Sequence, residues 1–320
     1  MSLTVSSRVY KPFRYPWAYK FWQEQQRMHW LAAEVPMGPD VKDWQTKLTP
    51  AEVNLLSNIF RFFTQGDIEV NECYMTKYAQ IFKPVEVKMM LSAISNTETI
   101  HIDAYSHLLE TLGIPETEYR AFLEYETMMN KVDMLEACSV KDPWDVAETM
   151  GVYAAFTEGL QLFASFAILL NFPRYNKMRG MGQIVTWSVR DESLHVEAIM
   201  KLYHTYVSEH PEIDKDRLTD TLTRRLKQVI ENEDKFIDLC FEMGGVQGLE
   251  AEDVKKYIRY IADIRCEQLN IPKQYFIDKN PLPWLDDMLN GVEHANFFET
   301  QATEYNKAST QGEWDEDIYS

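Results

Sequence analysis

Two copies of one short pattern pair a carboxylate with an imidazole. Glu98 and His101 form the first E-x-x-H pattern, and Glu192 and His195 form the second. On a helix, a spacing of three residues places acid and histidine on the same face, close enough to share one metal ion. A single E-x-x-H pattern is weak evidence because both residues are common on helices, whereas two copies in one chain indicate a shared site.

A further acid precedes each pattern on the previous long helix that periodicity predicts. Asp67 lies 31 residues before Glu98, and Glu158 lies 34 residues before Glu192. The sequence therefore repeats one unit, a helix with a single inward acid followed by a helix with E-x-x-H. Two such units facing each other would supply four carboxylates and two imidazoles. This is the ligand set of a dimetal site in a bundle core, with Asp in place of one Glu.

The charge of this ligand set favours two divalent cations. Four carboxylates and two neutral imidazoles carry a charge of −4, and unpaired acids are costly in an apolar core. Oxygen and imidazole ligands suit iron, our first expectation, or manganese or a mixed pair, and no nearby Cys indicates structural zinc. The alternative is a set of surface acids and hydrogen-bonded histidines. Against it, four apolar residues follow Glu158: Phe163, Phe166, Ile168 and Leu169.

A tyrosine continues the stripe of the first pattern. Tyr105 lies four residues after His101, an axial step of about 6 Å. A phenol one turn from a dimetal centre can lose an electron and a proton, although a buried tyrosine can also be a core residue with a hydrogen-bonded hydroxyl. Asp191 adjoins Glu192 but projects about 100° away around the helix. It is either a surface acid or a carboxylate that orients a ligand histidine.

Long helices must hold these residues. Thr49, Pro50 and Glu52 read as a capped helix start, and apolar residues then recur at three- and four-residue steps as far as Pro84. Periodicity predicts further helices over 84–113, 142–170, 178–210, 211–243 and 249–269, with Gly180 and Gly182 softening the start of one of them. We find no convincing alternating strands, so the sequence predicts an all-α helical bundle.

Composition excludes several classes of protein. The 320 residues include 32 Lys and Arg against 50 Asp and Glu, a net charge of −18, which argues against nucleic-acid binding. The longest apolar run, Leu162–Leu170, is about half of the ~20 residues that cross a bilayer. Four widely spaced cysteines show no zinc or disulfide pattern. Without a secretory signal at the N-terminus, we expect a soluble, cytoplasmic protein with free thiols.

The segments that carry these residues resemble the radical-generating small (beta) subunit of class I ribonucleotide reductase. The matching segments are FFTQGDIEVN, SNTETIHIDAYSH, TEGLQLFASF and VRDESLH, and the resemblance runs from about Trp30 into the tail. It implies a ferritin-like helical fold with additional helices and a ribonucleoside-diphosphate reductase activity. We accordingly expect an N-terminal segment over 1–30, a ferritin-like domain over 31–295 and a flexible tail over 296–320.

The resemblance also implies residue roles. Two metal ions, after reaction with dioxygen or a reduced relative, would oxidise Tyr105 to a stable radical inside an apolar cage that includes Phe166. Trp30 would hydrogen-bond to Asp191 in a relay toward the large subunit, and Tyr305 would continue it in the tail. The six metal ligands would be Asp67, Glu98, His101, Glu158, Glu192 and His195.

The tail and the partners follow from the same resemblance. The acidic tail would dock on the large (alpha) subunit, which would bind the ribonucleotide and hold the reducing cysteines. Tyr319 is the alternative to Tyr305 as the tail tyrosine that would relay the oxidising equivalent. A homodimer is expected from the family.

Two other functions share such a dimetal bundle. A ferritin-type ferroxidase or metal-storage protein fits less well because of the chain length, the helices beyond His210 and the acidic tail. In a ligand-binding dimetal oxidase the same centre would oxidise a bound lipid. Co-purified fatty acid, without large-subunit binding, would indicate that alternative.

Overall fold

The computed structural model describes residues 2–115, 117, 120 and 123–289. The chain divides into two compact units, Met1–Pro281 and Leu282–Ser320, and every element below belongs to the first. The predicted tail, with Tyr305 and Tyr319, lies outside the described residues. The expected domain boundaries at residues 30 and 295 stay predictions.

The described part of the first unit is helical and contains no strand beyond one isolated bridge between Val246 and Leu249. The prediction of an all-α bundle is therefore confirmed. The helices are α1 (Pro16–Arg27), the 3-10 turn η1 (Ala32–Glu34), α2 (Gly38–Thr46), α3 (Pro50–Glu72), the π-helix η2 (Cys73–Tyr78), α4 (Ala79–Ile81), α5 (Val85–Leu112), α6 (Glu126–Glu136), α7 (Pro143–Met150), the π-helix η4 (Gly151–Gln161), α8 (Leu162–Arg174), α9 (Arg179–Glu209), α10 (Lys215–Cys240) and α11 (Ala251–Leu269).

The predicted start and stop signals set the ends of the long helices. Thr49 and Glu52 form the expected capping box, with Glu52 N donating to Thr49 Oγ1 at 3.3 Å and Thr49 N donating to Glu52 Oε2 at 2.9 Å. Helix α5 ends at Gly113, whose φ of 73° a residue with a side chain rarely adopts. Asp142 caps α7 by accepting a hydrogen bond from Asp145 N at 2.9 Å.

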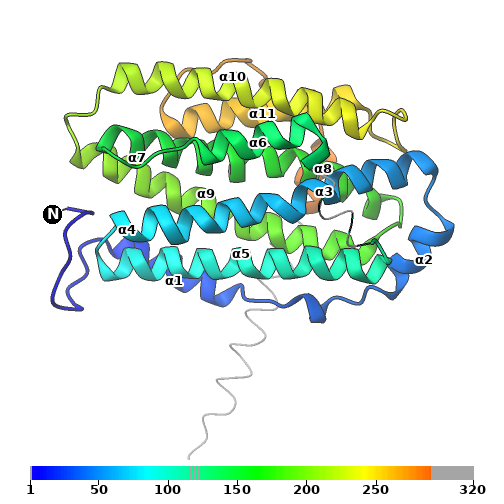
Figure 1. Ribbon diagram of the computed structural model, residues 1–320, viewed down its shortest axis with the longest axis horizontal. Coiled ribbons are helices and arrows are strands. Elements are labelled where there is room, and N and C mark those ends of the chain that lie inside the picture. Colours follow the sequence, from blue (N-terminus) through cyan, green and yellow to red (C-terminus); the bar gives the residue numbers. More distant parts are fainter. Residues whose placement is uncertain (1, 116, 118–119, 121–122, 290–320) are drawn as a thin grey trace, which may run out of the picture. The chain divides into compact units, whose positions relative to one another are not determined.

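The long helices pack lengthwise around an apolar core. Helix α3 packs on α5, while α9 packs on η4 and α8, and these helices run side by side in Figure 1. The continuous stretch Pro143–Arg174 is long and apolar enough to cross a membrane by length and composition, yet its apolar window is 100% buried inside the protein. It is the central core helix of the bundle. All four cysteines are buried free thiols, as expected.

Helix α2, which the periodicity did not predict, fixes the start of α9. Asp40 accepts hydrogen bonds from the backbone N–H groups of Gly180 and Met181, both at 2.8 Å. These bonds satisfy amides that a helix start leaves unpaired. A Cβ on Gly180 would lie 2.6 Å from Met37 Sδ. Gly180 thus permits close packing of α2 rather than softening the helix, which corrects our expectation.

A buried ion pair joins α6 to α10. The Lys131 ammonium contacts the Glu233 carboxylate, and both residues are at most 1% exposed. Lys131 Nζ also lies 4.0 Å from the ring centroid of Phe62 and 3.9 Å from that of Phe236, so two aromatic faces and one carboxylate stabilise its charge. The charge of each partner balances the charge of the other in a region from which water is excluded.

Lys131→Met should therefore lower the free energy of unfolding by about 3–5 kcal/mol, because it leaves Glu233 buried without a counter-charge. Adding Glu233→Leu to the same chain should recover most of that loss, since an apolar pair of similar volume is often tolerated at such a site. Urea unfolding of the two variants checks both statements. Equal destabilisation of the single and double variants would show that charge pairing is not the cause.

Candidate metal centre

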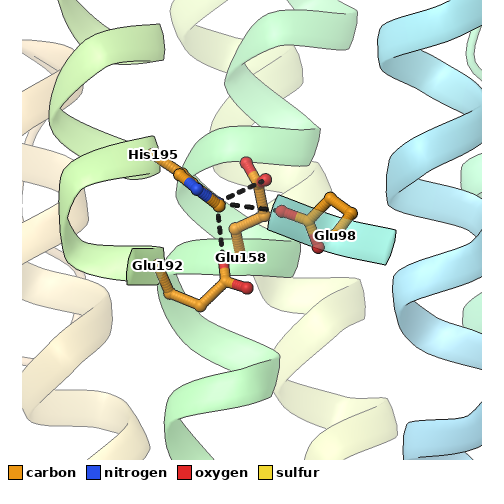
Figure 2. Close-up of side chains that lie close together, drawn as sticks. All are labelled: Glu98, Glu158, Glu192 and His195. Atoms are coloured by element: carbon orange, nitrogen blue, oxygen red, sulfur yellow. Dashed lines mark ion pairs between the residues drawn. The ribbon is translucent and has the colours of Figure 1, made fainter. Parts of the chain in front are cut away.

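The six predicted ligands come together in the core of the bundle. They are Asp67 on α3, Glu98 and His101 on α5, Glu158 on η4, and Glu192 and His195 on α9. Each of the six is at most 1% exposed. Figure 2 shows the side chains of Glu98, Glu158, Glu192 and His195 pointing toward one another from α5, η4 and α9.

The ligand-type atoms fall into two overlapping groups. Glu98, Glu158, Glu192 and His195 form the first group, which we name the Glu158 half-site; Asp67, Glu98 and His101 form the second, the Asp67 half-site. Within each group, one nitrogen or oxygen per residue lies within 4.8 Å of all the others. Since Glu98 belongs to both groups, the two half-sites share a carboxylate, as two neighbouring cations require.

Two glutamates lie between the two histidines. Glu98 places Oε1 2.9 Å from His195 Nδ1 and Oε2 3.6 Å from His101 Nδ1. Glu192 places Oε1 3.1 Å from His101 Nδ1 and Oε2 3.4 Å from His195 Nδ1. Each carboxylate thus presents one oxygen to each imidazole. This arrangement suits two bridging carboxylates, with Asp67 and Glu158 at the outer ends.

Several polar atoms in the cluster lack the hydrogen bond that buried groups normally make. Among the described residues, no partner with hydrogen-bond geometry is present for Asp67 Oδ2, both Glu98 oxygens, His101 Nδ1, Glu192 Oε2 and both nitrogens of His195. Such orphaned atoms are rare in folded proteins and call for an explanation. Their lone pairs converge on shared points, so oxygen- and imidazole-binding cations fit the cluster.

Burial and crowding shift the pKa values of the carboxyl groups in different directions. Loss of solvent raises the pKa of Asp67 and of Glu158 well above the ordinary range, and the charges of neighbouring glutamates raise them further. Burial also opposes ionisation of Glu98, but the adjacent His101 and His195 outweigh it and lower its pKa to about 2.

The two histidines take up positive charge for the same reason. Burial alone would lower their pKa values, but the surrounding carboxylates prevail and raise the pKa of His195 to about 10. Asp191, Glu192 and Glu98 likewise raise the pKa of His101 well above its usual value. All of these shifts except that of Glu98 favour proton uptake, which reduces the negative charge of the cluster.

A hydrogen-bonded chain leads from the Asp67 half-site to a tryptophan. His101 Nε2 lies 3.3 Å from Asp191 Oδ2, and Trp30 Nε1 donates to the same oxygen at 2.7 Å. Arg190 donates from Nη2 to Asp191 Oδ1 at 3.1 Å. Asp191 is therefore placed to fix the orientation of the His101 ring, as a carboxylate commonly does for a ligand histidine. The Trp30–Asp191 hydrogen bond is the one that the resemblance implies; the roles of both residues stay predictions.

Tyr105 lies in an aromatic pocket beside the cluster. Its ring centroid is 4.7 Å from that of Phe63, which lies 5.6 Å from that of Phe166. Its hydroxyl donates to Ser188 Oγ at 3.1 Å. Burial raises the pKa of Tyr105 well above its ordinary value, so the phenol keeps its proton at physiological pH. Phe63 and Ser188 were not predicted, since neither belongs to the repeated pattern.

The sequence also gave no indication of the two π-helical segments. Glu158 lies in η4, where each turn holds an extra residue. Gly159 follows it, and a Cβ there would come within 2.6 Å of both Ala154 O and Arg265 Nε. A Glu-Gly dipeptide inside a predicted helix was the one local indication in the sequence that the helix departs from regular geometry near Glu158. Tyr74 in η2, whose hydroxyl contacts Glu158, carried no such signal.

Together, the bundle and its buried cluster define a helical protein with a dimetal-carboxylate centre. The chain belongs to the family of the ribonucleotide reductase small chain, whose family model matches residues 7–281. A probable ribonucleoside-diphosphate reductase small subunit of Invertebrate iridescent virus 6 is 40% identical to it over 99% of this chain and 98% of the relative.

Solved structures show the same fold. The ribonucleotide reductase R2 subunit from Clostridium botulinum matches with a TM-score of 0.81 and 21% identity, over 88% of this chain and 90% of that one. Streptococcus sanguinis dimanganese(II)-NrdF matches with a TM-score of 0.75 and 19% identity, over 85% and 94%. The predicted ferritin-like helical fold is thereby confirmed.

Cation binding should release protons and weaken as the pH falls. The neighbouring carboxylates raise the pKa values of both imidazoles, so these rings hold protons that a bound cation must displace. Adding Mn²⁺ to weakly buffered protein should acidify the solution, and the apparent affinity should rise between about pH 6 and about pH 8. An affinity that is constant over this range, without acidification, would contradict the charge balance described above.

Proposed function

We propose that this chain is the radical-generating subunit of a class I ribonucleoside-diphosphate reductase. The observation that carries the proposal is the pair of half-sites that share Glu98, with Tyr105 one helix turn from His101. Membership of the small-chain family supports it. The ferritin-type and ligand-binding oxidase alternatives have no comparable support, since the relatives matched along the whole chain are reductase small subunits.

The six clustered side chains would hold two divalent metal ions per chain. Iron is our first choice, and two manganese ions or a mixed pair fit the same oxygen and imidazole ligands. The manganese of the Streptococcus sanguinis protein supports keeping this choice open. When bound, the metal pair would activate the oxidant, dioxygen or a reduced relative, and would pass an oxidising equivalent on to the protein. The chain's own residues then determine where the oxidising equivalent goes.

Tyr105 would store the oxidising equivalent by losing one electron and its phenolic proton. The hydrogen bond to Ser188 fixes the hydroxyl, and the rings of Phe63 and Phe166 exclude water from its surroundings. Exclusion of water and reductants would lengthen the life of the radical. Trp30, held by Asp191 next to His101, would begin the relay to the large subunit.

The partner would be the large (alpha) subunit, reached through the C-terminal tail. Tyr305 would carry the relay there, and residues 296–320 would form the docking segment beyond the ferritin-like domain. We further propose a homodimer located in the cytoplasm, with no nucleic-acid or membrane partner. These points rest on the family and on the acidic composition.

Tyr105→Phe should leave two metal ions bound and abolish the stable organic radical, because phenylalanine has no hydroxyl to lose a proton. Metal analysis and electron paramagnetic resonance on the same aerobically reconstituted sample check both halves of this expectation. A variant that retains the radical would place it on another residue. Loss of metal would instead show that the phenol supports the metal centre.

Tyr305→Phe should preserve the radical on Tyr105 and stop nucleotide reduction with the large subunit, because the relay would lack its tail phenol. Tyr319→Phe is the matched control, since it removes a second tail phenol fourteen positions further on. Turnover assays with radical quantification distinguish the two. Full turnover in Tyr305→Phe, with loss in Tyr319→Phe, would assign the relay to Tyr319.

A further inference from the structure

A second tyrosine contacts the candidate centre from η2, the π-helix that continues α3. The Tyr74 hydroxyl, on η2, lies 2.9 Å from Glu158 Oε1 and 3.2 Å from Glu158 Oε2, and donates its proton to this carboxylate. Tyr74 is 2% exposed. Burial raises the pKa of its phenol well above the ordinary value, so the hydroxyl keeps its proton.

The orientation of the Glu158 carboxylate rests on this hydrogen bond more than that of Glu98 or Glu192 rests on any single contact. Glu98 and Glu192 each approach both histidines, whereas the nearest imidazole nitrogen to Glu158, His195 Nδ1, is 4.0 Å away. Within the part of the chain that the structure describes, no side chain other than Tyr74 donates a hydrogen bond to Glu158.

We propose that Tyr74 is a positioning residue that holds Glu158 and thereby sets the cation affinity of the Glu158 half-site. The inference rests on the proposed function, because it takes Glu158 to be a metal ligand. The phenol fixes the direction of a carboxylate to which no other side chain of the described residues donates a hydrogen bond.

The effect should be confined to one of the two half-sites. Glu158 belongs to the group with His195 and not to the group of Asp67, Glu98 and His101. Without the phenol, the buried carboxylate would be free to rotate away from the half-site. The Asp67 half-site would keep its own ligands unchanged.

Titration of the full chain with Mn²⁺ tests this proposal, with free Mn²⁺ followed by its electron paramagnetic resonance signal. Wild-type protein should bind two ions, and Tyr74→Phe should bind one of them about tenfold or more weakly while the other is unaffected. Tyr78→Phe is the matched control. It removes another buried phenol of η2 whose hydroxyl has no hydrogen-bond partner among the described residues, and it should bind both ions as wild type does.

A second variant keeps the test decisive if Tyr74→Phe folds poorly. Glu158→Asp withdraws the carboxylate by one methylene and weakens the same hydrogen bond from the other side, so it should show the same selective loss. In that background Tyr74→Phe should add little, because the two residues act through one interaction. Unchanged affinities in Tyr74→Phe, or equal weakening of both ions, would overturn the proposal. Failure of wild-type protein to bind two ions would instead refute the proposed function.

Discussion

Four carboxylates buried in the core of one bundle impose the constraint on which the rest of the structure depends. Asp67, Glu98, Glu158 and Glu192 are almost without solvent contact, and two histidines alone supply nearby positive groups within the cluster. Isolated acids in such a place would be neutral or strongly destabilising. The charge balance requires protons or cations, and the convergence of unpartnered lone pairs favours cations.

The surrounding helices hold this costly arrangement in place. Asp40 on α2 binds the first amides of α9, the helix that carries Asp191, Glu192 and His195. The extra residue in each turn of η4 positions Glu158, and Tyr74 then fixes its carboxylate. Outside the cluster, Asp191 joins His101 to Trp30, so the group that orients a candidate ligand also begins the candidate relay.

The sequence predicted the cluster because one unit occurs twice, a helix with a single acid followed by a helix with E-x-x-H. The two E-x-x-H patterns and their preceding acids needed only helical periodicity, and Thr49 and Gly113 marked helix ends by local chemistry. The π-helices, the hydrogen bonds of Asp40 and the phenol of Tyr74 were not predicted. The π-helices are changes of helical register, and the other contacts join residues far apart in the chain, such as Asp40 and Gly180. Neither kind of feature produces a periodic pattern of apolar residues in the sequence. The proposed tail relay lies outside the described residues.

The most direct test of the central claim is anomalous diffraction from crystals of the protein loaded with Mn²⁺. The account predicts two anomalous peaks inside the bundle. One should lie among Asp67, Glu98 and His101, and the other among Glu98, Glu158, Glu192 and His195, with Glu98 and Glu192 between them. Absence of peaks at these side chains in crystals with ample Mn²⁺, or peaks only at surface carboxylates, would contradict it.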